Sequence, residues 1–178
     1  MYNREFRTKP TTVYCEGWNS DIITSEKDAD GYHTWKPYPQ IQKPDINQIE
    51  SDFGFKLKQN IKDFFTTYSF SRFGGTISTD KFENININFF GVNFEKPTID
   101  CILQSHKDGS YYFENSQIFV VGDTCINDND GYLLFYDNKK DSLFCINTTL
   151  FEESNHTKKT KIQLGGFLTV LSEMKPTI

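Results

Sequence analysis

The clearest pattern of apolar and polar positions along the chain is a helical stripe in residues 57–68. One large apolar side chain recurs every three or four positions, at Leu57, Ile61, Phe64, Phe65 and Tyr68. This spacing predicts an amphipathic helix with all five side chains buried on one face. A shorter helix is predicted just before it, capped by Asp45 and stopped by Gly54.

Two further helices are predicted from similar spacing. Residues 97–107 place Ile99, Ile102 and Leu103 on one face, and this helix is expected to end before Asp108-Gly109. The last helix is predicted from about residue 159 or 161 to Met174, closed by a proline. Its apolar face is formed by Leu164, Phe167, Leu168, Leu171 and Met174.

Alternating and continuous apolar runs predict the strands. Residues 84–90 alternate isoleucine or phenylalanine with asparagine, which is typical of a half-buried antiparallel strand. A short strand is predicted at 76–79, after a turn at Gly74-Gly75. Asp- and Asn-rich hairpin turns join three more apolar runs, at 117–122, 132–136 and 143–146. The order predicts an α+β fold, with a mostly antiparallel twisted sheet flanked by helices.

The N-terminal part is weakly patterned. Residues 1–34 are mostly polar, and we expect an arm that packs on a single domain formed by residues 35–178. The segment from Trp35 to Pro44 carries three prolines, which favour an extended entry into the first helix. The length of 178 residues fits one domain.

Charge and cysteine usage restrict the partner and the compartment. The net charge of −5 repels phosphate backbones and argues against nucleic acid, whereas it suits a basic protein partner or simple solubility. The four cysteines have no zinc-site spacing. No stretch approaches 18 apolar residues and the N-terminus lacks a signal-peptide pattern, so we expect a cytoplasmic protein without membrane insertion.

Motifs for chemistry are missing from the sequence. His33, His106 and His156 stand in polar contexts without metal-ligand spacing, and no nucleophile motif occurs. Asp128 and Asp130 resemble part of a calcium loop, but Ile126 would occupy its first ligand position, so a hairpin turn is favoured. We predict no catalytic residue, cofactor or metal. An enzyme with a site assembled from dispersed Asp/Glu and His33 or His106 remains the alternative.

The remaining candidate is an acidic surface. The turns at 123–130 and 137–141 and the segment 151–155 are expected to project from one region of the sheet. Such a patch would suit a partner rich in Lys and Arg; scattered solubilising charge is the alternative. The predicted partner-binding residues are Asp123, Asp128, Asp130, Tyr132, Asp137, Asp141, Glu152 and Glu153.

The segment that includes the strongest helix also carries a family resemblance. Trp35, Pro37 and Pro39 form a W-x-P-x-P motif, which is followed by the two helical segments Ile46–Phe53 and Ile61–Phe70. Together with Ser20–Thr24 and the segment Phe167–Pro176, this pattern resembles the Syd family of the SUKH superfamily. The similarity covers about residues 20–76, recurs at 161–178 and is patchy between.

The resemblance implies an α+β fold and a non-enzymatic binding role. Syd associates with the cytoplasmic face of the SecY translocon, and much of the superfamily consists of immunity proteins that neutralise secreted toxins, often nucleases or deaminases. Residues 109–115 and the enlarged acidic turns depart from the Syd pattern. The departure favours an immunity protein that binds a cognate toxin; a regulator that docks on the cytoplasmic loops of SecY is the alternative.

Overall fold

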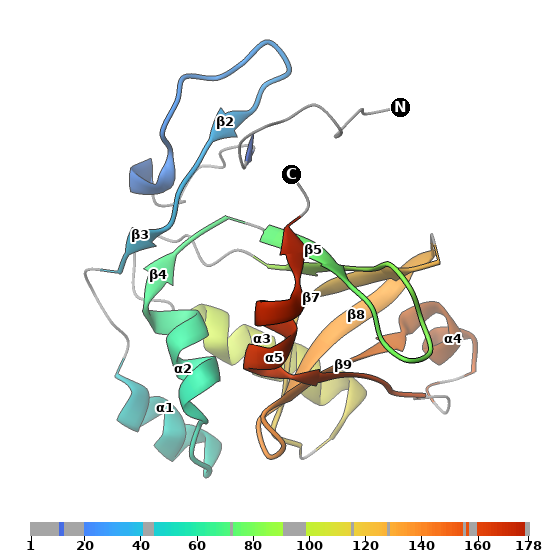
Figure 1. The fold of residues 1–178 in the computed structure, drawn as a ribbon. Coiled ribbons are helices and arrows are strands. Elements are labelled where there is room, and N and C mark those ends of the chain that lie inside the picture. Colours follow the sequence, from blue (N-terminus) through green and yellow to red (C-terminus); the bar gives the residue numbers. More distant parts are fainter. Residues whose placement is uncertain are drawn as a thin grey trace.

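A seven-stranded antiparallel sheet forms the centre of the molecule (Figure 1). The computed structural model describes residues 11–12, 20–40, 45–71, 73–90, 99–114, 116–127, 129–154, 156 and 160–176. The strands follow the order β10-β9-β8-β7-β6-β5-β11. Their bounds are β5 Phe73–Ile77, β6 Ile85–Phe89, β7 Ile118–Ile126, β8 Asn129–Asp137, β9 Ser142–Asn147, β10 Ile162–Gly166 and β11 Lys175–Pro176.

Helices flank this sheet and complete the predicted α+β fold. They are α1 Ile46–Phe53, α2 Gln59–Thr66, α3 Ile99–Tyr112, α4 Thr148–Glu153 and α5 Phe167–Glu173. The main core lies between one face of the sheet and side chains from α1, α2, α3 and α5. A smaller core, which includes Phe135 and Phe144, lies on the other face against the end of α3. The fold prediction is therefore confirmed.

The first two helices form largely where the sequence predicts them. The Asp45 side chain accepts from the backbone N–H groups of Asn47 and Gln48, and Gly54 ends α1 with φ 70°. Leu57, Ile61 and Phe65 are buried. The prediction is wrong for Tyr68, which is 46% exposed, because α2 ends at Thr66 and the chain continues as the short strand β4 Tyr68–Ser69.

A buried carboxylate holds the joint between α1 and α2. Glu50 is only 4% exposed, and it accepts from the ammonium groups of Lys56 and Lys62 at 2.7 Å each. It also accepts from the backbone N–H of Leu57 at 2.9 Å. Burial alone would raise the pKa of Glu50, but these three donors outweigh burial and lower it to about 2. The ionised carboxylate therefore fixes the angle between the two helices.

Two predictions about glycines are wrong for the same steric reason. Gly74 and Gly75 lie inside β5 rather than in a turn, and α3 continues past Gly109 to Tyr112. A Cβ atom at Gly74 would lie 2.2 Å from the carbonyl oxygen of Ile87, and one at Gly109 equally close to that of Ile118. These glycines permit close backbone approach and do not mark ends of elements.

The close approach at Gly109 lets α3 cover an open stretch of β7. Strand β6 pairs with β7 only from Gly122 onward, so among the described residues the first half of β7 has no partner strand on that side. There Ser105 Oγ donates to the carbonyl of Val120 at 2.6 Å, and His106 Nε2 lies 3.1 Å from the carbonyl oxygen of Ser116. The helix thus protects carbonyl groups that would otherwise form an exposed sheet edge.

The C-terminal segment differs most from its prediction. The expected single helix is a strand, β10, followed by the short helix α5. Gly165 has φ 129°, which interrupts any helix, and Gly166 is the N-cap of α5. Pro176 belongs to β11, which pairs with β5. Helix α4 replaces what the sequence suggested was an acidic loop; its signal was Asn147, whose side chain caps the N–H of Leu150.

The N-terminal part forms small structures beside the sheet. Strands β1 Thr11–Thr12 and β2 His33–Thr34 pair, as do β3 Tyr38–Pro39 and β4. The 3-10 helix η2 Ser20–Ile22 contributes Ile22 to the main core, where Trp35 is also buried. The predicted division of the chain into an arm and a domain after residue 34 stays a prediction.

Candidate protein-binding surface

The β8–β9 turn holds two of the predicted binding residues, and both have internal hydrogen bonds. Asp137 is buried, and its carboxylate accepts from the backbone N–H groups of Lys139 and Lys140 at 3.0 and 3.2 Å. Asp141 has φ 53° and accepts from Tyr136 Oη at 2.7 Å. The pKa of Tyr136 is raised chiefly by burial, and to a smaller extent by its hydrogen bond to Asp141. These carboxylates stabilise the turn.

The same turn binds α2 and the segment before it. Asn60 Nδ2 donates to both carboxylate oxygens of Asp141. Asn138, which is buried, accepts from the N–H of Lys58 at 2.7 Å and donates to the carbonyl of Lys56 at 2.9 Å. Sequence reasoning missed Asn138, because its partners lie about eighty positions away.

Of the other predicted residues, Asp130 and Tyr132 lie toward the opposite end of β8, and Asp123 pairs with Leu133 in its middle. Asp123 on β7 accepts from Asn88 Nδ2 at 3.1 Å, and Tyr132 packs against the main core. Asp130 lies in the first residues of β8, and Asp128 falls outside the described residues. Because β8 spans nine residues, its two ends are about 26 Å apart. The expectation that all the acidic turns project from one region is therefore wrong.

Helix α4 brings Glu152 and Glu153 to the Asp130 end of the sheet. It begins directly after β9, whose last residue pairs with Tyr132. Thr148 Oγ1 donates to the carbonyl of Gly131 at 3.1 Å, which fixes the helix beside the start of β8. Figure 1 shows α4 at the far side of the sheet from α1 and α2.

Side chains that sequence reasoning missed surround Glu152. Tyr111, in the last turn of α3, donates from its hydroxyl to Glu152 Oε1 at 3.2 Å. His156 Nε2 lies 2.9 Å from Glu152 Oε2, and its ring stacks on the buried Phe151 at 4.7 Å. Tyr111 is 55% exposed and Leu150 48% exposed. We call this surface the α3–α4 ridge, formed by Tyr111, Leu150, Glu152, Glu153 and His156.

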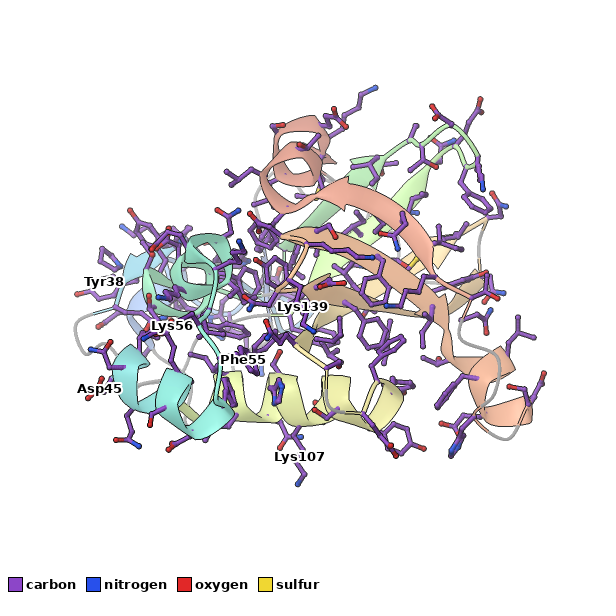
Figure 2. All side chains as sticks on the ribbon, turned by 90° about the horizontal axis from the view of Figure 1, so that it is seen from below. Tyr38, Asp45, Phe55, Lys56, Lys107 and Lys139 are labelled. Atoms are coloured by element: carbon purple, nitrogen blue, oxygen red, sulfur yellow. The ribbon has the colours of Figure 1, made fainter. Side chains whose placement is uncertain are left out.

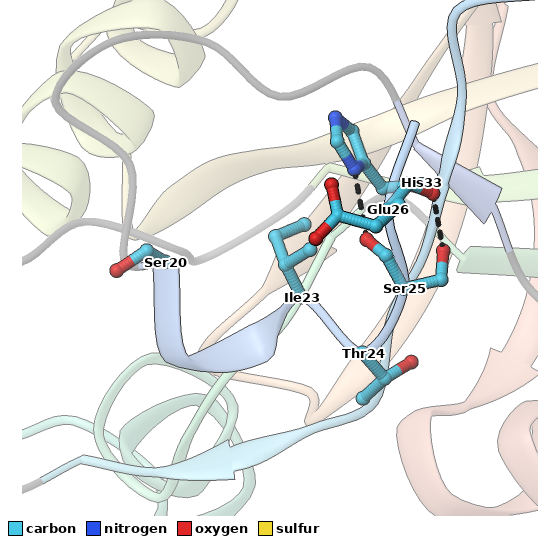
Figure 3. Close-up of a pocket in the computed structure, with 6 residues that line it drawn as sticks. All are labelled: Ser20, Ile23, Thr24, Ser25, Glu26 and His33. Atoms are coloured by element: carbon cyan, nitrogen blue, oxygen red, sulfur yellow. Dashed lines mark hydrogen bonds between the residues drawn. The ribbon is translucent and has the colours of Figure 1, made fainter. Parts of the chain in front are cut away.

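A second candidate is an open pocket of about 640 Å³ near the N-terminus (Figure 3). Its lining includes Ser25, Glu26 and His33, a combination that can support catalysis. His33 Nδ1, however, lies 3.0 Å from the Ser25 carbonyl oxygen. Ser25 Oγ donates to the carbonyl of Glu26 and accepts from the N–H of Thr34. The serine hydroxyl is thus engaged with backbone groups and not with the imidazole.

His106 has a packing role. Its ring lies 4.4 Å from that of Phe53 and 5.2 Å from that of Phe119, between α1, α3 and β7. Phe55 points into the same region (Figure 2). Among the residues that the structure describes, no three His, Cys, Asp or Glu side chains gather closely enough to hold a metal ion.

Comparison with known families decides the classification. A family model described as Syd protein (SUKH-2) matches residues 1–91, just over half of the chain. The chain belongs to the Syd (SUKH-2) family. This confirms the resemblance noted in the sequence. No curated protein matches the chain significantly.

Membership of the Syd family indicates a protein-binding role, since Syd and its SUKH relatives are binding and immunity proteins and not known enzymes. The matched residues contain α1, α2, β5 and β6, whereas the α3–α4 ridge follows them. Most of the net negative charge also lies after residue 91, outside the matched residues. Residues 1–91 hold 12 acidic and 11 basic side chains, and residues 92–178 hold 12 and 8. Within the described ranges, no helix of this Syd-family chain combines the length and apolar character needed to cross a membrane.

Proposed function

We propose that this Syd-family protein is a bacterial, cytoplasmic immunity protein that neutralises a cognate toxin by direct protein–protein binding, without catalysis. The observation that carries the proposal is the location of the acidic surface. Most of the net negative charge, and the exposed carboxylates of α4, belong to the half of the chain outside the family match. A scaffold that matches the family, joined to an acidic surface outside the match, suits a partner that differs from one family member to the next.

The chemistry of such toxins supports the proposal. A toxin that acts on nucleic acid needs a basic cleft to bind phosphates. An acidic surface on this protein would compete for that cleft and accelerate association by electrostatic attraction. The proposed contact residues are Asp123, Asp128, Asp130, Tyr132, Glu152 and Glu153. Asp137 and Asp141 are left out, because they hold the β8–β9 turn together at the end of β8 away from α4.

The test is growth rescue. If the gene next to this one encodes a toxin, that toxin is expressed in bacteria from an inducible promoter, with or without this protein; a neighbourhood without a toxin gene would count against the proposal. The wild-type chain is expected to restore growth and to copurify with the toxin. The charge-reversal pair Glu152→Lys and Glu153→Lys is expected to reduce rescue and copurification together.

The control has the same charge change at the other end of the molecule. Asp52 and Asp63 are exposed on α1 and α2, which lie away from α4 in both views (Figures 1 and 2). Their reversal to lysine should leave rescue intact. Copurification with SecY and no effect on any toxin would instead support the alternative role, a regulator that docks on basic cytoplasmic loops of the translocon.

A further inference from the structure

The α3–α4 ridge contains an ordered group of an aromatic ring and a carboxylate. The Tyr111 hydroxyl and the His156 ring both lie within hydrogen-bonding range of Glu152, one at each carboxylate oxygen. Tyr111 also contacts Tyr112 edge-to-face, with ring centroids 4.9 Å apart. Its ring is therefore held by neighbours on both elements although more than half of its surface is exposed. An exposed side chain that is already ordered loses little entropy when a partner binds.

The electrostatic surroundings of this group are negative. Partial desolvation, and next the carboxylate of Glu152, raise the pKa of Tyr111. Desolvation is also the largest cause of the raised pKa of Tyr112, to which Glu152 and Asp108 contribute. Glu153 follows on α4 and is exposed. Lys107 lies one helical turn before Tyr111 and points away from the sheet (Figure 2). Its ammonium group therefore opposes the negative field only on the side of α3 that faces away from the sheet.

We infer that Tyr111 and Glu152 form an anchor for an arginine side chain on the basic surface of a partner protein. The tyrosine ring offers a face for a guanidinium, which favours aromatic faces. Carboxylates beside the ring supply the opposite charge and hydrogen-bond acceptors. Leu150 adds exposed apolar area on the same short helix as Glu152. Tyrosine and arginine are the residue types that most often dominate protein–protein binding energy.

This inference deepens the proposed function, since it names the contact by which a basic toxin would be held. It can nevertheless be tested without the toxin. The probe is a fluorescein-labelled peptide of eight arginines, and its binding to the full chain is followed by fluorescence anisotropy at low salt. Tyr111→Ala and Glu152→Gln are each expected to weaken binding several-fold, and the pair about tenfold.

Matched variants separate a specific anchor from general attraction. Tyr68→Ala removes another exposed tyrosine, on β4, and Asp63→Asn removes another exposed carboxylate. Each should change binding less than twofold. Lys107→Glu should strengthen binding about two- to threefold, because it replaces an opposing charge. Equal losses at the ridge and at the control positions would overturn the inference.

NMR mapping gives a second readout that does not depend on variant folding. In the wild-type protein, backbone amide shifts on titration with the peptide should concentrate at Tyr111 and residues 150–156. Shifts concentrated elsewhere, for example in the acidic loop 21–30, would overturn the anchor. If the toxin is neutralised equally well by the wild type and by Tyr111→Ala/Glu152→Gln, the anchor is wrong and the immunity role stands. If peptide binding maps to the ridge but no toxin is neutralised, the anchor stands and the immunity role is wrong.

Discussion

Asn60 on α2 donates from Nδ2 to both carboxylate oxygens of Asp141, at 3.0 and 2.8 Å. The two residues are 81 positions apart, and they join the family-matched half of the chain to the β8–β9 turn. Asp141 also accepts from Tyr136 Oη, and its backbone carbonyl accepts from the first N–H of α5. Asp141 therefore stabilises the positions of two helices, α2 from the family-matched half of the chain and α5 from the other half.

Asp141→Ala is expected to lower the free energy of unfolding by about 2–4 kcal/mol, measured by urea denaturation. The substitution leaves the buried Tyr136 hydroxyl and the Asn60 amide without their acceptor. It also places alanine at φ 53°, where a Cβ atom is unfavourable. Asp141→Asn should cost less, about 1 kcal/mol, because asparagine tolerates this conformation and keeps one acceptor oxygen. A cost below about 0.5 kcal/mol for the alanine variant would contradict this role.

Coupling between the two halves can be measured directly. In a double-mutant cycle of Asn60→Ala and Asp141→Ala, we expect an interaction energy of about 1–2 kcal/mol, since the carboxylate is charged and partly buried. Strictly additive effects would show that the hydrogen bonds in the structure contribute nothing to stability.

The lowered pKa of Glu50 predicts that acid weakens the joint between α1 and α2. Its folded-state pKa of about 2 lies below the ordinary value of 4.5, so its contribution to stability is present above pH 4.5 and is lost as the pH falls toward 2. The shift corresponds to at most about 3 kcal/mol. Glu50→Gln should therefore be less stable than the wild type at pH 7, and the difference should shrink below pH 4.5. Asp52→Asn, on the exposed face of α1, is the control and should change the free energy of unfolding at pH 7 only slightly.

Gly109→Ala should destabilise the protein although alanine normally favours a helix by about 1 kcal/mol. The new Cβ atom would lie 2.2 Å from the carbonyl oxygen of Ile118, so α3 must move away from β7 at a cost of about 1–3 kcal/mol. Ser110→Ala, at the next position of the same helix, is the control and should be neutral or slightly stabilising. Thermal denaturation of both variants checks the prediction. If Gly109→Ala raises the melting temperature, the close packing of α3 on β7 is wrong.

Cys145 should be chemically protected. Its side chain is fully buried in β9, and burial raises the pKa of its thiol to about 11. With the other three cysteines replaced by serine, iodoacetamide should modify Cys145 at least about a hundredfold more slowly at pH 8 than after denaturation, since the thiolate is the reactive form. A chain that keeps only Cys125, which is partly exposed, should react faster when folded. Comparable folded-state rates would contradict the buried position.

Local patterns predicted the elements that depend on neighbouring residues. The capping of α1 by Asp45 and Gly54 is confirmed, and so is the alternation of β6, whose isoleucines are buried. These features follow from side chains within one or two turns of each other. The stripe of α2 was right in its interior and wrong at Tyr68, because tertiary pairing with Pro39 in β3 takes over there.

The C-terminal segment shows where local pattern fails. Leu164 and Phe167 are both buried. Their spacing of three residues fits a continuous helix, and it fits a strand that leads into a helix equally well. The positive φ of Gly165 and the pairing of β10 with β9 decide the outcome, and neither is visible from periodicity.

The acidic residues could be named from the sequence, but their roles could not. Asp141 and Glu152 look alike as loop or surface carboxylates, yet one accepts from α2 and the other holds Tyr111 at the surface. These two partners, Asn60 and Tyr111, lie 81 and 41 positions away in the sequence. Only the fold determines which carboxylates are engaged internally and which remain for another protein.

The strand order has a consequence for any attempt to divide the chain. Strands β5 and β6, which lie within the matched residues 1–91, pair on one side with β11 and on the other with β7. The segment that defines the family is therefore inserted between two strands of the other segment and is not an autonomous module. Fragments cut between β6 and α3 should remain unfolded alone and regain structure only when mixed, so the protein is a natural candidate for a split reporter whose signal requires both pieces.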